Sequence, residues 1–138
     1  MTRDKVIAEA KTWLNTPYHH MAGIKGVGVD CGQLLIEVFH NVGLAPKIDT
    51  GYYPSDWHFH KAEEQYLGWV TKYAKATDTP KAGDIALFKF GRCISHGAIV
   101  LDWPLCIHSH LGRGCVYVNA DDAELAGRLA GFYTVFED

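Results

Sequence analysis

The stretch of sequence that decides the fold reads Gly28-Val29-Asp30-Cys31-Gly32-Gln33-Leu34-Leu35. Asp30 has the side chain of a helix N-cap, and Cys31 is then the first residue of the helix. The helix dipole and the unpaired N–H groups of a first turn favour a thiolate over a thiol at this position. Because the thiolate is the reactive form, Cys31 is a candidate nucleophile, and the alternative is a small core cysteine.

Two more helices are expected, one on either side of this one. The first starts at a Thr2 cap and ends at Asn15-Thr16-Pro17, because proline cannot continue the helical hydrogen bonds. The last starts at a Ser55 cap, and residues 18–30 and 44–54 are expected to be irregular. Apolar side chains recur at helical spacing in all three segments: Val6, Ile7, Ala10, Trp13 and Leu14; Leu34, Leu35, Val38, Phe39 and Val42, with Gly43 as the C-terminal cap; Phe59, Ala62, Tyr66 and Leu67.

Strand-like runs replace the helical pattern after Pro80. They cover residues 85–90, 96–101, 105–110, 115–119 and 132–136. Tight turns are expected at Asp102-Trp103-Pro104 and Gly112-Arg113-Gly114, and a short helix from Asp121 or Asp122 to about Leu129. Helices followed by an antiparallel meander predict an α+β fold, in which N-terminal helices pack on one face of a C-terminal sheet of about five strands.

Length, charge and composition limit the class of protein. The chain has 138 residues, 48% hydrophobic and 21% charged, so a single domain over 1–138 is expected. The formal net charge is -3 without a basic stripe, which argues against nucleic acid as a partner. No export signal or membrane-spanning run is visible, so synthesis in the cytoplasm is expected. Cys31, Cys93, Cys106 and Cys115 are then expected to be free thiols.

Two histidines on neighbouring expected strands are candidate partners for the thiol. His96 lies in Ser95-His96-Gly97-Ala98-Ile99-Val100, and His108 lies in Leu105-Cys106-Ile107-His108-Ser109. The turn between the strands places the two histidines opposite or nearly opposite, about 5 Å apart on one face. His108 can then bond the far ring nitrogen of His96 and fix its tautomer. A lone strand histidine is more often structural, but this combination is the layout of a papain-like cysteine hydrolase.

The order of short motifs resembles the NlpC-type cell-wall peptidases, a family with a permuted papain-like fold. The matching motifs run from the first helix to about residue 119. They are Thr16-Pro17-Tyr18, Gly28-Val29-Asp30-Cys31-Gly32, Lys81-Ala82-Gly83-Asp84-Ile85, Ser95-His96-Gly97-Ala98-Ile99-Val100 and Ile107-His108-Ser109. Each motif is short, and their order and spacing together make the resemblance specific.

The resemblance implies a cysteine peptidase with a Cys31 nucleophile, a His96 base and a His108 orienting residue. It also implies that Tyr18 and Asp30 bind substrate or stabilise the oxyanion near the thiol, with the Cys31 backbone N–H as another donor. For Tyr18 the alternative is a packed loop aromatic. Family members usually cleave between D-glutamate and the diamino acid of peptidoglycan stem peptides. No cofactor is implied.

Two segments depart from the family pattern. Gly32-Gln33 replaces the usual Ser-Gly after the cysteine, which puts a polar side chain in the first helical turn. In residues 52–69, the runs Trp57-His58-Phe59-His60 and Tyr66-Leu67-Gly68-Trp69, with His19-His20 earlier, are similar to a subset of these peptidases encoded in phage and gene-transfer-agent tail gene clusters. This similarity implies tail proteins as partners and delivery by a phage-like particle.

Other interpretations of the same residues stay open. A structural tail-tip or hub module that keeps the fold fits the sequence, as does another thiol amidase or acyltransferase on the same scaffold. His58-x-His60 and Cys106-x-His108-x-His110 have spacings that suit zinc, because alternate strand residues share a face. A metal on His108 would remove it from the triad, so no metal site is predicted.

Overall fold

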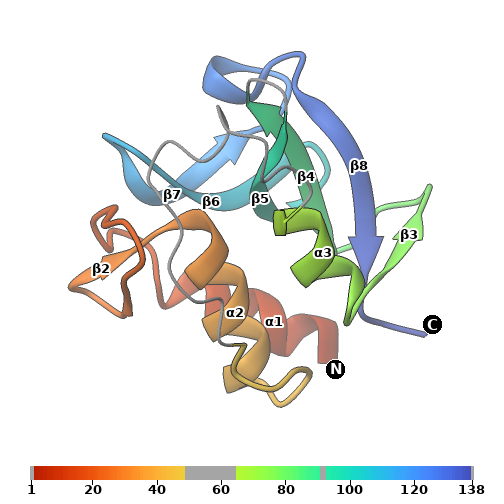
Figure 1. Cartoon of the computed structure of the whole chain (residues 1–138), viewed down its shortest axis with the longest axis horizontal. Helices are drawn as coiled ribbons and strands as arrows, with labels where there is room; N and C mark the ends of the chain where they lie inside the picture. Colours follow the sequence, from red (N-terminus) through yellow and green to blue (C-terminus); the bar gives the residue numbers. More distant parts are fainter. Residues whose placement is uncertain (1, 49–64, 91–92, 138) are drawn as a thin grey trace.

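Three helices pack on one face of a six-stranded antiparallel sheet in the computed structural model, which describes residues 2–48, 65–90 and 93–137 (Figure 1). The helices are α1 (Thr2–Lys11), α2 (Cys31–Asn41) and α3 (Gln65–Thr71), with a 3-10 turn η2 (Ala123–Leu125). The strands are β1 (Gly23–Ile24), β2 (Gly28–Val29), β3 (Lys75–Thr77), β4 (Ile85–Phe90), β5 (Cys93–Asp102), β6 (Leu105–His110), β7 (Gly114–Asn119) and β8 (Leu129–Thr134). The predicted α+β class is confirmed.

The large sheet has the strand order β3-β8-β4-β5-β6-β7. Strands β4 to β7 form the expected meander, in which Ile99 pairs with Ile85 on one side and Ile107 on the other. The meander does not continue to β8, which returns across the sheet to pair with β4. Strand β3, in the described part of the chain, was not expected from the sequence. Its three residues, paired at the sheet edge, are too few to show a periodic pattern.

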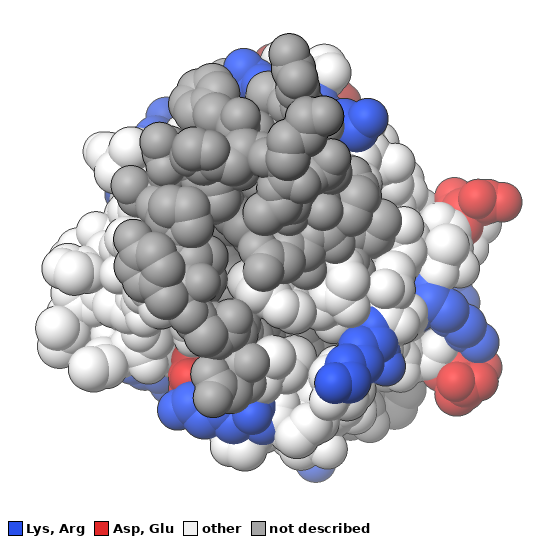
Figure 2. Space-filling model, viewed as in Figure 1, with Lys and Arg blue, Asp and Glu red and all other residues white. Residues whose placement is uncertain are grey.

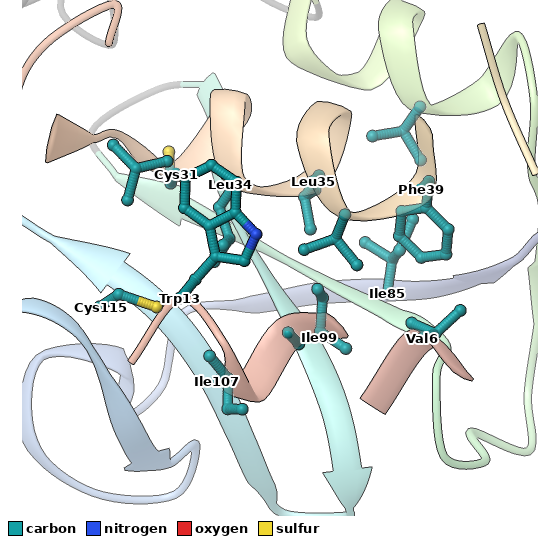
Figure 3. Close-up of a cluster of buried hydrophobic side chains, with 14 of the residues drawn as sticks. Val6, Trp13, Cys31, Leu34, Leu35, Phe39, Ile85, Ile99, Ile107 and Cys115 are labelled. Carbon is teal, nitrogen blue, oxygen red and sulfur yellow. The ribbon is translucent and has the colours of Figure 1, made fainter. Parts of the chain in front are cut away.

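The core lies between α2 and the sheet (Figure 3). Leu34 and Val38 of α2 are fully buried, as their helical spacing predicts, and Trp13 closes the same layer from the α1 side. The sheet contributes alternate residues to this layer, because successive strand side chains point to opposite faces. Toward the helices point Ile85, Leu87, Ile99 and Ile107, and toward the other face Ala86, Phe88, Ala98 and Val100.

Two expectations for the N-terminal part were wrong in detail. Helix α1 ends at Lys11, and residues 12–14 continue as a tighter turn in which each N–H bonds the carbonyl three residues back. The expected loop 18–30 contains the two-residue strands β1 and β2. The periodic side chains of the first helix still pack as expected, with Val6 and Ala10 fully buried.

The expected helix from Asp121 or Asp122 to Leu129 was also wrong. Only η2 forms there, and Gly127 then turns the chain at φ 73°. Leu129 already belongs to β8, where it pairs with Phe88. The observed strand β8 therefore begins and ends earlier in the chain than the predicted strand 132–136, because pairing with β4 decides where β8 begins.

The expected third helix lies only partly within the described residues. Its Ser55 cap, Phe59 and Ala62 fall in 49–64, outside the described residues. The segment from Gln65 onward is helical as α3.

The first turn of α1 and the last residues of the described chain meet at one corner of the molecule (Figure 1). Arg3 donates to the carbonyl oxygen of Ala82 at 2.8 Å and to Asp84 Oδ1 at 3.0 Å. Its guanidinium also lies over the Phe136 ring, 4.2 Å from the ring centre. Arg3 thus ties α1, the turn before β4 and the segment after β8 together.

Charged side chains on the visible, described part of one face of the molecule do not gather in one patch (Figure 2). On the face drawn in Figure 2, Lys and Arg side chains lie apart from one another, and no continuous basic stripe crosses its described part. Within the described ranges, none of the helices has both the length and the apolar character needed to cross a membrane.

Gly114→Ala should destabilise the fold more than Gly112→Ala. Both glycines have positive φ, 77° and 84°, so alanine at either is strained by about 1–2 kcal/mol. A Cβ on Gly114 would also lie 2.8 Å from the Thr16 carbonyl oxygen, which cannot retreat because it accepts the Cys115 N–H, whereas Gly112 has open space. Urea unfolding should show an extra loss of about 1–3 kcal/mol at Gly114. Equal losses would contradict this account.

Candidate active site

The buried Asp30 carboxylate fixes the start of α2. Its Oδ1 accepts the Gln33 N–H at 2.8 Å, which confirms the predicted N-cap. Its Oδ2 accepts the Met21 N–H, also at 2.8 Å, so the same side chain holds the preceding loop. Cys31 is therefore the first helical residue, at the positive end of the helix dipole.

Two contacts anchor the start of α2 to the strands that carry the histidines. The Cys31 sulfur lies 3.6 Å from the Ser95 carbonyl oxygen, and Ser95 directly precedes His96. The Ser109 hydroxyl donates to the Val29 carbonyl at 2.7 Å, and Ser109 directly follows His108. Cys31 and Val29 thus each contact one of the two histidine segments, and Cys31 lies at one end of the core (Figure 3).

His96 and His108 form a buried hydrogen-bonded pair. His96 Nε2 lies 2.8 Å from His108 Nδ1, and the rings meet edge to face at 86°. The strand pairing Ile99↔Ile107 makes the two histidines diagonal neighbours rather than direct partners, and their long side chains close the gap. The sequence-based expectation that His108 reaches a ring nitrogen of His96 agrees with this geometry.

Both histidines are neutral near pH 7. Burial lowers the pKa of His96 well below 6.5, and the electrostatic cost of a second positive charge beside His108 and His110 lowers it further. Burial also lowers the pKa of His108 to about 4, helped by His110 and Arg113 and opposed by Glu124. A neutral imidazole has a lone pair on one ring nitrogen, so the pair can accept a proton.

Tyr18 lies in the loop that precedes Cys31, near enough for the charge of Cys31 to affect the pKa of its phenol. Its backbone forms a β-bridge with Val29, which is two residues before Cys31. Burial raises the pKa of its phenol above 10, and the negative charges of Cys31 and Asp30 raise it further. The hydroxyl therefore stays protonated and able to donate. Asp30, by contrast, is buried with both oxygens on backbone N–H groups, and its contact with substrate stays a prediction.

Two groups outside the predicted triad border the histidine pair: His110, which the sequence offered only as a zinc ligand, and Glu124, which it did not single out. The His110 ring stacks on His108 at 9°, and alternation along β6 was a signal for it. Glu124 Oε1 lies 3.5 Å from His108 Nε2, and Glu124 Oε2 lies 3.7 Å from Arg113. No local pattern points to Glu124, because a one-turn 3-10 helix carries it to the far side of His108.

Among the described residues, the two histidines of the pair and His110 form a group that could hold a metal ion. His96, His108 and His110 offer ligand atoms within 4.8 Å of one another, whereas the zinc spacing in the sequence had included Cys106. The 2.8 Å contact of His96 with His108 is a hydrogen bond, and two ligands of a tetrahedral zinc lie about 3.3 Å apart. Zinc would have to break this bond beside the cation of Arg113. His58 and His60 fall outside the described residues.

The other described thiols are poor nucleophiles. Cys106 and Cys115 are fully buried, free, and held by burial at a pKa of about 12. The free-thiol expectation is confirmed for these two and for Cys31. Cys31 differs from them in lying at a helix start against the histidine strands.

Comparisons with known proteins find the fold but no close sequence. No family model matches the chain, and no curated protein sequence matches it. An NlpC/P60 family protein from Bacillus cereus superposes with a TM-score of 0.70 at 20% identity, covering 94% of this chain and 39% of that one. A lipoprotein-like protein of the NLP/P60 family from Staphylococcus aureus gives 0.69 at 19% identity, covering 99% and 42%.

A third solved structure matches over nearly its whole length. The NlpC/p60 domain of the peptidoglycan hydrolase SagA gives a TM-score of 0.62 at 20% identity, covering 95% of this chain and 96% of that one. The chain thus spans about two fifths of the first two proteins and nearly all of the SagA domain. At these identities the similarity establishes an NlpC/P60 fold.

Stability should fall as pH decreases from about 6.5 to about 4. The lowered pKa of His108 means that the unfolded chain binds more protons in this window, so protonation favours unfolding. The shift from 6.5 to about 4 corresponds to about 3 kcal/mol, fully present above pH 6.5. His108→Gln should flatten this part of the urea-unfolding profile, and His40→Gln, at an exposed site on α2, should not. An unchanged slope in His108→Gln would refute the assignment.

Proposed function

We propose that the chain is a cysteine peptidase that hydrolyses amide bonds in peptidoglycan stem peptides. The observation that carries the proposal is the His96–His108 hydrogen bond beside strands that contact the start of the Cys31 helix. The NlpC/P60 fold supports it, since the SagA domain with this fold belongs to a peptidoglycan hydrolase.

The reaction begins with proton transfer from the Cys31 thiol to His96. Because His96 Nε2 is engaged with His108, Nδ1 is the nitrogen that takes the proton. The thiolate attacks the carbonyl carbon, and the Tyr18 hydroxyl and the Cys31 N–H donate to the oxyanion. His96 returns the proton to the leaving amine, which leaves a thioester. Water, deprotonated by His96, then releases the carboxylate and regenerates the thiol.

The finer parts of the proposal rest on the sequence resemblance alone. The bond cleaved is the one between D-glutamate and the diamino acid of the stem peptide. The proposed setting is a phage-like particle, whose tail proteins are partners and which carries the enzyme from the cytoplasm to the cell wall. The residues that support this setting are the aromatic runs of 52–69, together with His19 and His20.

Cys31→Ala should abolish muropeptide cleavage. Removal of the nucleophile is expected to lower kcat/KM by about a thousandfold or more. Mass spectrometry of digested muropeptides should show new fragments beginning with the diamino acid only for the protein with Cys31. Cys106→Ala, which removes a buried thiol on the other face of the sheet, is the matched control and should keep activity. Equal digestion by wild type and Cys31→Ala would rule out the proposal.

His108→Gln should lose less activity than His96→Ala. Glutamine can still hydrogen-bond His96, whereas alanine at position 96 leaves no base for the thiol. The expected losses are about tenfold to a hundredfold for His108→Gln and about a thousandfold for His96→Ala. Steady-state kinetics on the same muropeptides measure both, and the reverse order would contradict the assigned roles.

A further inference from the structure

We infer that Glu124 is a positioning residue that selects the catalytic tautomer of the His96–His108 pair; the inference rests on the proposed function for its effect on turnover. His108 Nε2 and Glu124 Oε1 lie 3.5 Å apart. Both atoms are buried, and neither has a hydrogen-bond partner among the described residues. An unpaired buried donor or acceptor is destabilising. Two such atoms that face each other are therefore explained as donor and acceptor of one hydrogen bond.

The proton positions follow from the hydrogen bond between the rings. One of the two facing nitrogens, His96 Nε2 or His108 Nδ1, must carry the proton. If His96 Nε2 carries it, His96 Nδ1 has the lone pair that a base needs, and neutral His108 carries its proton on Nε2. If His108 Nδ1 carries it, neutral His96 is protonated on Nδ1 and cannot accept the thiol proton.

Glu124 distinguishes these two arrangements. In the first, the His108 Nε2–H points at a carboxylate oxygen, which is an attractive, charge-assisted contact. In the second, a nitrogen lone pair faces the same oxygen and repels it. The 3.5 Å separation is longer than a hydrogen bond of about 2.9 Å, so a side-chain movement of less than about 1 Å forms the bond. Glu124 therefore favours the arrangement in which His96 is a base.

The groups around Glu124 keep its carboxylate charged and oriented. Burial raises its pKa, but a hydrogen bond from its own backbone N–H and electrostatic interactions with His110, Arg113 and His108 together hold the pKa below its ordinary value. Arg113 lies 3.7 Å from Oε2 and leaves Oε1 toward His108. The groups that face the histidine pair from the packed elements are thus His110, Arg113, Arg128 and Glu124.

The same charge stabilises the intermediate state. When His96 takes the thiol proton it becomes an imidazolium, and His108 remains neutral between it and Glu124. A carboxylate at the end of this chain of hydrogen bonds lowers the free energy of the imidazolium, as the third group of a triad does. The thiol, two imidazoles and a carboxylate then form one relay from α2 through β5 and β6 to η2.

The test uses Glu124→Ala, Glu124→Gln and, as a matched control, Glu137→Gln at an exposed glutamate. Long-range proton–nitrogen NMR of the folded proteins should place the His108 proton on Nε2 in wild type, and Glu124→Ala should shift it toward Nδ1. Alkylation of Cys31 by iodoacetamide at pH 7 should be about tenfold slower in Glu124→Ala than in wild type, which corresponds to one pKa unit. Mass spectrometry of the Cys31 peptide measures this rate. On muropeptides kcat should fall by a similar factor with KM unchanged.

The second glutamate variant and the controls separate the outcomes. Glu124→Gln keeps an acceptor oxygen without the charge, so it should retain the wild-type tautomer and recover part of the rate, and it remains informative if the alanine variant does not fold. Glu137→Gln should match wild type. A wild-type tautomer and alkylation rate in Glu124→Ala would overturn the inference even if muropeptides are cleaved. If Glu124→Ala shows the expected changes in tautomer and alkylation rate while the wild type cleaves no muropeptide, the inference about Glu124 is supported and the proposed function is refuted.

Discussion

The Asp30 carboxylate accepts hydrogen bonds from the N–H groups of Met21 and Gln33, and the geometry of the whole site depends on this double contact. One bond ends the loop and the other begins α2, so the buried Asp30 carboxylate sets the point at which Cys31 enters the helix. The neighbouring Val29 carbonyl is held by Ser109, and the Cys31 sulfur meets the Ser95 carbonyl. The strands position the histidines, and the contacts of Ser109 with Val29 and of Ser95 with Cys31 position the thiol against the strands.

Elements with a strong local pattern were predictable from the sequence. The start of α2 follows from Asp30, its end from Gly43 at φ 80°, and the strands β4 to β7 from apolar runs separated by turns. Elements defined by distant pairing were not. Strand β3 has three residues and exists because Lys75 to Thr77 pair with β8, and the place of β8 beside β4 depends on contacts across the sheet. Such pairing leaves no periodic signal in a short segment.

The candidate site divides in the same way. Cys31, His96 and His108 occur in motifs whose order is visible along the chain, and the structure places these motifs together. Glu124 occurs in a single turn that the sequence favoured as part of a longer helix, and only the fold brings it to His108. Asp30 shows the opposite case. Its residue type suggested a cap, the family resemblance implied a substrate contact, and the structure has both its oxygens on backbone N–H groups.

Arg3, held between Asp84 and the Phe136 ring, brings the two ends of the described chain to one corner of the molecule (Figure 1). The start of α2 lies at the other end of the core, where Cys31 meets β5 (Figure 3). A tether, a purification handle or a surface linker attached at either end therefore leaves from the side remote from the thiol. The domain can be immobilised through either terminus with the thiol end directed outward.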